Sequence, residues 1–290
     1  MVFLSLALVL HKLEVAEVLQ GNVLMSVGSG FLPANRGGGN DVDPVGSLAQ
    51  NRWASEDMLV VQPVRELVLA SGSPRRRQLL AALGVPFVVE PVEVVEDRLP
   101  SESPEDMVVR LSVAKARLAA ARHANGIIVG SDTSVSRGCG QAAEMMGKPR
   151  DERHLRAMLD RLLGAAHTVH TGYAVLDARG GQFACGFQAV EVRLRPLTAG
   201  ELEDYLGSGI GDDKAGGYAV QDRQYRLVES LEGCAAAAMG LPLCVLLRVL
   251  PRFGVVVPGA DAVGARCEEL TGVECCMSEA RECPNWVANA

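Results

Sequence analysis

Residues 70–77 read ASGSPRRR and stand between the apolar run ELVL and the leucine-rich run QLLAALG. The apolar run predicts a short buried strand that ends at Ser71. A helix is predicted to begin directly after Ser73, because a hydroxyl caps a helix well and Pro74 suits its first position. Three arginines then fall in the first turn, where the helix dipole disfavours cations. This stretch therefore predicts a strand–turn–helix unit whose charge is matched by an anion.

A phosphate group is the anion that this unit suits best. Unpaired backbone N–H groups at a helix start point outward and bind anions. Ser71 and Ser73 add hydroxyl donors, and Arg75 and Arg76 add forked guanidinium groups that match phosphate oxygens. The stretch is not a P-loop, which requires GxxxxGK[ST]. The alternatives are a solvated basic turn or a phosphorylation site in a disordered tail, and the adjoining strand and helix argue against the second.

The composition limits the partners that the chain can have. Its 290 residues carry a net charge of −7, which argues against a broad nucleic-acid-binding surface. No stretch reaches the roughly 18–20 apolar residues that span a bilayer. The N-terminal apolar run also lacks the basic start and the cleavage site of a signal peptide. We therefore expect a cytoplasmic protein with no stable nucleic-acid partner and no membrane partner.

Two changes in composition divide the chain. Residues 30–57 are rich in Gly, Asn, Asp and Pro, as in a flexible linker, and hydrophobic periodicity fades after 257. These changes predict an N-terminal extension over 1–65 that is flexible or foreign to the fold, a central domain over 66–257, and a loosely structured, cysteine-containing tail over 258–290. Strand-like and helix-like runs alternate in the central domain, which also holds a GG-centred hairpin. The predicted fold is α/β, with a mixed twisted sheet flanked by helices.

One long amphipathic helix is predicted after Ser103, which is followed by a proline and two acids. Met107, Leu111, Ala114 and Leu118 recur at helical spacing, so we expect them to form its buried stripe.

Asp132 is the leading candidate for chemistry. It comes just past an almost entirely apolar strand, so we expect its carboxylate at the mouth of that strand, near the phosphate site. There it suits a Mg²⁺ ligand or a base that activates water, and a structural cap of the next turn is the alternative. The segment VVEPVEVVED offers further acids, most of them surface charges, of which one could help to hold a metal.

Three lysines stand where they could reach a ligand. Lys115 lies on the long helix close to its expected buried stripe, Lys148 lies in the turn MGKPRD, and Lys214 precedes two glycines that allow close backbone approach. Each alone is more typical of a solvated surface, but together with the two arginines they suit a polyphosphate. Gln221, at the end of YAVQ, carries an uncharged amide that could read the edge of a nucleobase.

Eight segments occur in the order and approximate spacing of one known family: ASGSPRRRQLLAALGVPF, VVRLSVAKA, VGSDTSV, MGKPRD, HTVHTG, DKAGGYAVQ, VESLEG and MGLPL. Over about 66–252 the sequence resembles the Maf proteins, which are nucleoside triphosphate pyrophosphatases also described as septum-formation inhibitors. The resemblance implies hydrolysis of a nucleoside triphosphate to the monophosphate and pyrophosphate with a divalent metal, Mg²⁺ or Mn²⁺. It also implies a mixed α/β fold related to the inosine-triphosphate pyrophosphatases and often dimeric, so a homodimer is an expected partner.

The resemblance also implies roles for single residues. Asp132 is expected to activate water or to bind the metal, and Glu96 matches the acidic metal-binding position after the first helix. Gln221 matches the glutamine of the branch that prefers dTTP and UTP, so these nucleotides or modified forms of them are the expected substrates. The residues expected to bind the phosphates are Ser71, Arg75, Arg76, Lys115, Lys148 and Lys214.

The chain departs from the family pattern at one acidic position. Val95 stands where a second acid usually precedes Glu96, so metal coordination by this segment has one carboxylate fewer. Two other functions stay open at this point. One is a non-catalytic nucleotide-binding regulator of cell division with the same cleft, and the other is a phosphatase or nucleotidyltransferase that uses SGSPRRR to bind phosphate.

Eight cysteines are spread unevenly along the chain. Four are scattered singly and are predicted to be small buried thiols; these are Cys139, Cys185, Cys234 and Cys244. The other four crowd the C-terminal end, where no pair has the two-residue gap of a zinc knuckle, so their spacing disfavours a metal site. They are Cys267, Cys275, Cys276 and Cys283.

Overall fold

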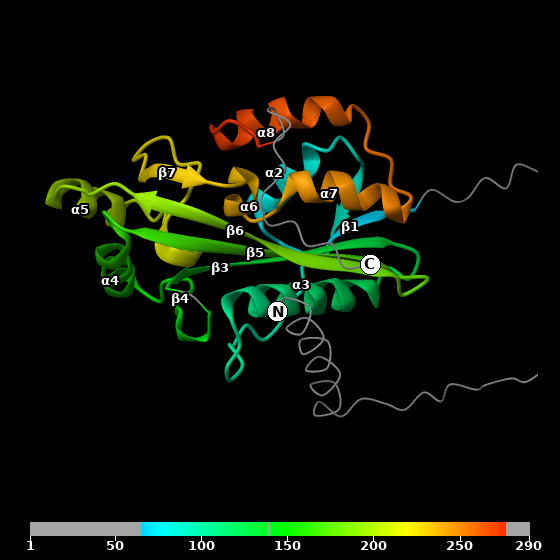
Figure 1. Ribbon diagram of the computed structural model, residues 1–290, viewed down its shortest axis with the longest axis horizontal. Coiled ribbons are helices and arrows are strands. Elements are labelled where there is room, and N and C mark those ends of the chain that lie inside the picture. The colour runs from blue at the N-terminus through cyan, green and yellow to red at the C-terminus, as the bar shows by residue number, and fades with distance from the viewer. Residues whose placement is uncertain (1–64, 139, 277–290) are drawn as a thin grey trace, which may run out of the picture. The chain divides into compact units, whose positions relative to one another are not determined.

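The computed structural model describes residues 65–138 and 140–276 (Figure 1). Nearly all of the predicted N-terminal extension, the end of the predicted tail, and the two cysteines Cys139 and Cys283 lie outside the described residues. Seven strands form one sheet in the order β2-β1-β3-β5-β6-β7, and β4 pairs with β3. The predicted mixed α/β sheet is therefore confirmed.

The sheet has a parallel and an antiparallel part. β1 pairs in parallel with β2 and with the first residues of β3, whereas β3, β5, β6 and β7 are antiparallel neighbours. The predicted GG-centred hairpin is present as β5 and β6. The strands are β1 (Leu67–Leu69), β2 (Phe87–Val89), β3 (Ile127–Arg137), β4 (Glu144–Met146), β5 (Ala166–Asp177), β6 (Phe183–Leu194) and β7 (Val228–Glu232).

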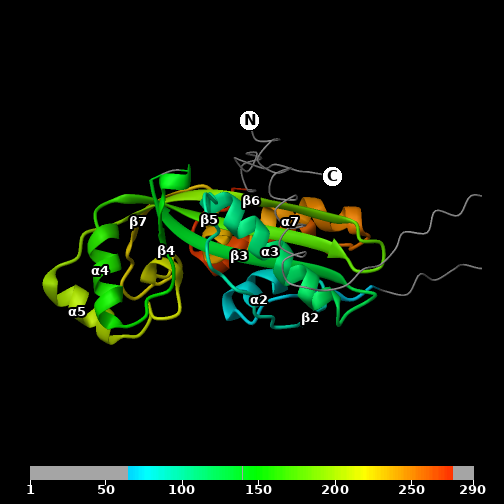
Figure 2. The ribbon, with the colours of Figure 1, turned by 90° about the horizontal axis from the view of Figure 1, so that it is seen from below.

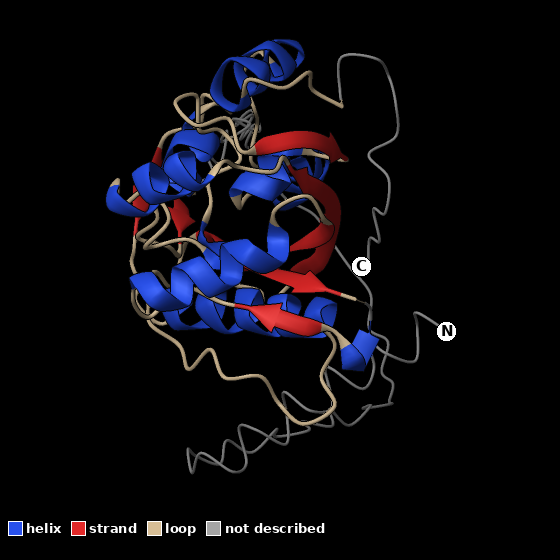
Figure 3. Cartoon of the chain, turned by 90° about the vertical axis from the view of Figure 1, so that its left-hand side faces the viewer, coloured by secondary structure: helices blue, strands red, loops and turns tan. Residues whose placement is uncertain are grey.

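Helices cover both faces of the sheet (Figures 1 and 3). One face carries α3, which lies across β3, β5 and β6 (Figure 2), and the other carries α2, α6, α7 and α8. No helix in the described part of the chain has both the length and the apolar character needed to cross a membrane. The helices are α2 (Pro74–Ala81), α3 (Pro104–Ala120), α4 (Glu152–Leu162), α5 (Ala199–Gly207), α6 (Ala235–Met239), α7 (Leu243–Val249) and α8 (Val263–Thr271).

The buried face of α3 differs from the predicted stripe. Leu118 is 47% exposed, whereas Ser112, Lys115 and Ala116 are buried. Two glycines in the sheet explain the change, because a Cβ on Gly130 of β3 would lie 2.2 Å from the Ser112 carbonyl oxygen. A Cβ on Gly172 of β5 would lie equally close, 2.2 Å from the Val108 carbonyl oxygen of the helix. The helix therefore packs against bare sheet backbone with its small side chains, and this rotation turns Lys115 inward.

The predicted loosely structured tail is wrong over 260–276. Most of this segment forms α8 (Val263–Thr271), whose Val263, Cys267 and Thr271 recur at every fourth residue and are buried. Three buried positions, one of them polar, make too short a pattern to be distinguished from a loop in the sequence. α8 packs on α2 and α6, so the segment belongs to the core that supports the site.

Candidate active site

A gap along one edge of β3 creates the candidate site. β1 pairs with residues 127–129 of β3, and β4 pairs with residues 135–137 on the same edge. No strand of the described chain pairs with residues 130–134 there, because the backbone leaves β1 at Ser71 and turns into α2. A cavity of about 740 Å³ opens at this gap. It is lined by residues 71–76, 132–135, 145–148 and 218–221, by part of the loop after β2, and by side chains of α3 and α6.

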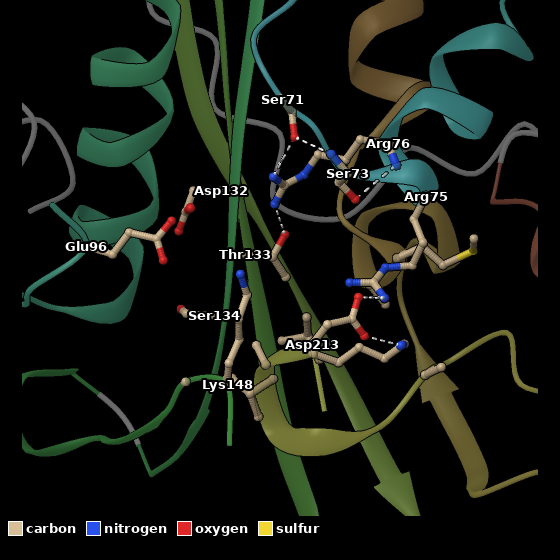
Figure 4. Close-up of a pocket in the computed structure, with 18 of the residues that line it drawn as sticks. Ser71, Ser73, Arg75, Arg76, Glu96, Asp132, Thr133, Ser134, Lys148 and Asp213 are labelled. Carbon is tan, nitrogen blue, oxygen red and sulfur yellow. Dashed lines mark hydrogen bonds and ion pairs between the residues drawn. The ribbon is translucent and has the colours of Figure 1, made fainter. Parts of the chain in front are cut away.

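The carboxylates of Glu96 and Asp132 lie side by side in the cavity (Figure 4), and the buried Lys115 of α3 joins them. Lys115 Nζ donates to Asp132 Oδ1 at 2.6 Å and to Glu96 Oε1 at 2.8 Å. The side chains of Lys115 and Asp132 are 8% and 9% exposed, whereas that of Glu96 is 52% exposed. Burial opposes ionisation of Glu96, but the hydrogen bond and charge of Lys115, with the charges of Lys148 and Arg76, hold the pKa of that carboxyl below its ordinary value. Glu96 therefore faces the lysine as a carboxylate.

Asp132 lies within β3, and the prediction that it follows the end of a strand is wrong. The strand continues to Arg137, and distant partners satisfy the hydroxyl groups of Ser131 and Ser136 within it. Ser131 Oγ donates to the Gly172 carbonyl oxygen at 2.7 Å, and Ser136 Oγ lies 2.9 Å from a ring nitrogen of His170. Small polar residues that read as a turn in the sequence are thus buried strand residues. Asp132 is held by strand geometry on the face that α3 covers.

The turn between β1 and α2 forms the facing wall. α2 begins after Ser73 as predicted, Ser73 Oγ accepts from the Arg76 backbone N–H at 3.5 Å, and no acid lies in the first turn. Arg76 donates through Nη1 to Ser71 Oγ at 3.2 Å and through Nη2 to Thr133 Oγ1 at 3.0 Å. Its Nε donates to the Gly240 carbonyl oxygen at 2.9 Å. Arg76 is thus fixed from three elements.

Arg76 keeps donors for a ligand despite these bonds. A guanidinium group has five N–H donors, so three bonds leave one N–H on each terminal nitrogen. Burial lowers the pKa of Arg76, and the carboxylate of Asp132 opposes that shift. An anion in the cavity would act in the same direction as Asp132, because it would compensate a charge that burial disfavours.

The remaining cations of the cavity are held less firmly. Arg75 Nη1 lies 3.9 Å from Asp213 Oδ2, and the side chain of Asp213 is 69% exposed. Lys214 Nζ donates to the same carboxylate and to the Ile210 carbonyl oxygen. Lys148 is exposed and has no hydrogen-bond or ion-pair partner within the described ranges.

Sequence comparison identifies the family to which this cavity belongs. A family model described as Maf-like protein matches residues 66–253, which is more than half of the chain. The chain belongs to the Maf-like proteins.

Curated relatives and one solved structure are similar to this Maf-like protein. A dTTP/UTP pyrophosphatase of Syntrophotalea carbinolica is 42% identical over 192 residues, covering 66% of this chain and 86% of the relative. A dTTP/UTP pyrophosphatase of Geobacter sulfurreducens is 41% identical over 190 residues, covering 66% and 97%. A solved structure, a nucleoside-triphosphatase / dITP/XTP pyrophosphatase from Mycobacterium abscessus, is 17% identical over 46% of this chain and 76% of its own. Its TM-score of 0.29 is too low to show a shared fold.

The fold brings every predicted site residue of this Maf-like protein to one cavity, while their individual roles stay predictions. Gln221 is half-buried and lines the cavity beside Tyr218. Val95 is 72% exposed and does not line it, and neither does Arg77. The predicted residues that line the cavity are Ser71, Arg75, Arg76, Glu96, Lys115, Asp132, Lys148, Lys214 and Gln221.

Two hydroxyl residues of the site were missed in the sequence. Thr133 Oγ1 accepts from Arg76 and from Thr171 Oγ1, which lies 3.1 Å away. Ser134 is only 6% exposed and lines the cavity, and its hydroxyl has no hydrogen-bond partner in the part of the chain that the structure describes. Strand alternation places Ser134 on the same side as Asp132, so a strand continued through Asp132 would have pointed to it.

Asp132 and Glu96 fit a divalent cation. Both carboxylates reach one ammonium nitrogen, so their oxygens converge on a point where a positive charge already lies. Carboxylate oxygens are the hard ligands that Mg²⁺ and Mn²⁺ prefer. The chemistry of these two carboxylates suits a divalent cation, and their metal role stays a prediction.

Proposed function

We propose that this Maf-like protein is a nucleoside triphosphate pyrophosphatase, a hydrolase of acid anhydrides that converts dTTP and UTP to the monophosphate and pyrophosphate. The observation that carries the proposal is the buried Lys115–Asp132 pair facing the Ser71–Arg76 turn across one cavity. An acid that can act on water thus faces a group that binds phosphate. The two dTTP/UTP pyrophosphatases that are about two-fifths identical to the chain support the substrate assignment.

The polyphosphate binds along the cationic walls of the cavity. The turn offers backbone N–H groups and the remaining donors of Arg76, while Lys148, Lys214 and Arg75 supply positive charge. Once Lys214 and Arg75 bind phosphate oxygens, they no longer depend on Asp213. Neutralising the substrate in this way lowers the barrier to attack by water, because negative charge accumulates on the leaving pyrophosphate.

Asp132 acts on the attacking water. Its carboxylate takes up the proton of the water or would help to hold the divalent metal, and Lys115 holds this carboxylate in place through the 2.6 Å hydrogen bond. Water adds to the α-phosphorus in line with the bond to the β-phosphate oxygen, that bond breaks, and pyrophosphate leaves. A divalent cation, Mg²⁺ or Mn²⁺, held by Asp132 and Glu96 would supply further charge neutralisation.

Gln221 selects the base in this proposal. Its amide has both donors and an acceptor, which suits the polar edge of a pyrimidine. A purine is rejected by its size alone. This selects against the wrong base less strongly than a site whose buried polar groups would be left without partners. The cytoplasmic location and the homodimer stay predictions.

A nucleotide panel with product identification tests the function. The wild-type protein is incubated with dTTP, UTP, CTP, GTP and ITP and either Mg²⁺ or Mn²⁺, beside the Asp132→Asn variant and a matched Asp160→Asn control. Asp160 is an exposed acid on α4 outside the cavity. We expect monophosphate and pyrophosphate from dTTP and UTP with the wild type and the control, and no release with Asp132→Asn.

Two results would overturn the proposal. Release of orthophosphate in place of pyrophosphate would make the protein a phosphatase. If no nucleotide yields pyrophosphate, the protein would instead be a non-catalytic nucleotide-binding regulator.

A further inference from the structure

Five cysteines gather away from the cavity, where α6, α7 and α8 pack together. The Sγ atoms of Cys234, Cys244 and Cys276 lie within 4.8 Å of one another. Cys234 and Cys244 are buried and Cys276 is half-buried. Beside this trio, the buried thiols of Cys267 and Cys275 share a hydrogen bond.

The spacing of the sulfurs suits a tetrahedral metal. Two thiolates bound to one Zn²⁺ at about 2.3 Å in a tetrahedron lie about 3.8 Å apart. The sulfurs of Cys234 and Cys244 are 3.8 Å apart, whereas a disulfide requires about 2.05 Å. Simple contact between two thiols gives a similar separation for one pair. The decisive feature is therefore that a third sulfur, from Cys276, lies within 4.8 Å of both.

The three sulfurs come from separate parts of the fold. Cys234 directly precedes α6, Cys244 lies in α7, and Cys276 follows α8. The sequence disfavoured a metal site because the C-terminal cysteines lack the spacing of a zinc knuckle. The fold adds Cys234 and Cys244, which are far from the C-terminal cysteines in sequence. A ligand set assembled in this way leaves no spacing motif in the sequence.

We propose that Cys234, Cys244 and Cys276 bind a thiophilic metal ion, Zn²⁺, with a fourth ligand from Cys267 or Cys275. Each sulfur loses its proton to solvent as its bond to the metal forms, and no oxidant or reductant takes part. The half-buried Cys276 provides the path of entry.

The proposed metal has a structural consequence for the cavity. It joins the segment that follows α8 to α6 and α7, and α8 packs on α2 and α6. α2 carries Arg76, and Ala238 and Met239 of α6 line the cavity. A zinc ion here fastens α8 over the elements that position the phosphate-binding wall.

Metal analysis of the purified full-length protein tests the proposal. The protein is purified under reducing conditions without added metal and dialysed extensively against metal-free buffer, which removes divalent ions held weakly by carboxylates. Zinc is then measured in the wild type, Cys244→Ser, Cys276→Ser and the control Cys185→Ser. Cys185 is buried on β6, outside the cluster. We expect about one zinc ion per chain in the wild type and Cys185→Ser, and loss of zinc in the two other variants.

A cobalt titration keeps the test independent of how the variants fold. Metal-free wild-type protein is titrated with Co²⁺ under reducing conditions, where thiolate-to-cobalt charge-transfer absorption and intense visible bands of tetrahedral Co²⁺ are expected, and Zn²⁺ should abolish them. The proposal is overturned if the wild type holds no zinc and shows no charge-transfer band. It is also overturned if both serine variants retain full zinc, or if mass analysis after alkylation finds a disulfide within the trio in the purified protein.

Discussion

The two walls of the cavity hold their charged groups in different ways. On the inner wall, formed by Arg76, Lys115 and Asp132, the groups are bonded to the fold and largely removed from water. On the outer wall, formed by Arg75, Lys148 and Lys214, the exposed carboxylate of Asp213 is the partner of Arg75 and Lys214. Lys214 also donates to the Ile210 carbonyl oxygen, and Lys148 has no partner in the described part of the chain. The inner wall is therefore fixed by the fold, whereas on the outer wall Lys148 has no such support in the described part of the chain.

The two walls are therefore expected to contribute differently to turnover and to substrate binding. A preorganised charge in a site shielded from water stabilises a transition state without reorganisation, so changes there reduce kcat. A solvated charge acts over a longer range, is screened by salt and contributes little to folding. Inner-wall variants should thus alter turnover and stability together, whereas variants of the exposed Lys148 should alter KM alone.

The largest effect is expected from Lys115→Met. Removing one member of a buried ion pair leaves Asp132 buried without its partner, which costs about 3–5 kcal/mol of unfolding free energy. We also expect kcat to fall about 1,000-fold, since both charge neutralisation and the position of Asp132 are lost. Urea unfolding and pyrophosphate release measure the two quantities, with Lys148→Met as the matched control. Retention of kcat with an increase in KM alone would place Lys115 among the solvated cations.

Gly130→Ala tests whether close packing of α3 sets the inner wall. The new Cβ would lie 2.2 Å from the Ser112 carbonyl oxygen and 3.0 Å from the Ala116 backbone nitrogen, on either side of Lys115 in the helix. The helix must move away, which costs about 1–3 kcal/mol and lowers kcat about 100-fold through misplacement of the lysine.

Gly200→Ala is the matched control, because it lies in α5 and no heavy atom lies within 4 Å of its added Cβ. It should keep full activity and add up to about 1 kcal/mol of stability. If Gly130→Ala were as stable and active as this control, the close approach of α3 would not be what positions Lys115.

Local signals predicted the parts of the fold that depend on neighbouring residues. The start of α2 followed from the hydroxyl of Ser73 and the proline after it, and the β5–β6 hairpin followed from two glycines between apolar runs. The set of residues around the cavity was also predictable, because cations in separate turns and an acid near a phosphate site have few other common purposes. The family resemblance supported the same set.

The parts that failed depend on residues distant in sequence. The buried face of α3 depends on glycines in β3 and β5, and the length of β3 depends on acceptors such as the Gly172 carbonyl oxygen. Ser134 was missed for the same reason, since it joins the site only if β3 continues past Asp132. The cysteine cluster likewise exists only once α6, α7 and α8 are packed. No window of sequence contains such information.

The free energy of unfolding should depend on pH through His167, whose side chain is buried. His167 Nε2 lies 2.6 Å from the hydroxyl oxygen of Tyr218, which lines the cavity. Burial lowers the pKa of His167 from 6.5 to about 4, so as the pH falls the unfolded chain binds a proton before the folded protein does. The folded state therefore loses about 3 kcal/mol between roughly pH 6.5 and 4.

Urea unfolding across this pH range measures the loss in the wild type, in His167→Gln, and in the control His154→Gln. The slope of stability against pH should flatten in His167→Gln and remain in the control. An unchanged slope in His167→Gln would show that another group titrates in this range.

The smallest effect is expected from Lys148→Gln on the outer wall. Loss of one solvated charge should raise KM for dTTP about tenfold at low salt, which is about 1.4 kcal/mol, and leave kcat within about twofold. The difference from wild type should shrink as salt screens the interaction. Arg77→Gln is the matched control, because Arg77 follows the same phosphate-binding turn but does not line the cavity. A salt-independent fall in kcat for Lys148→Gln would show that this lysine contacts the reacting phosphate and is fixed there by substrate, and the inner wall would then extend across the cavity.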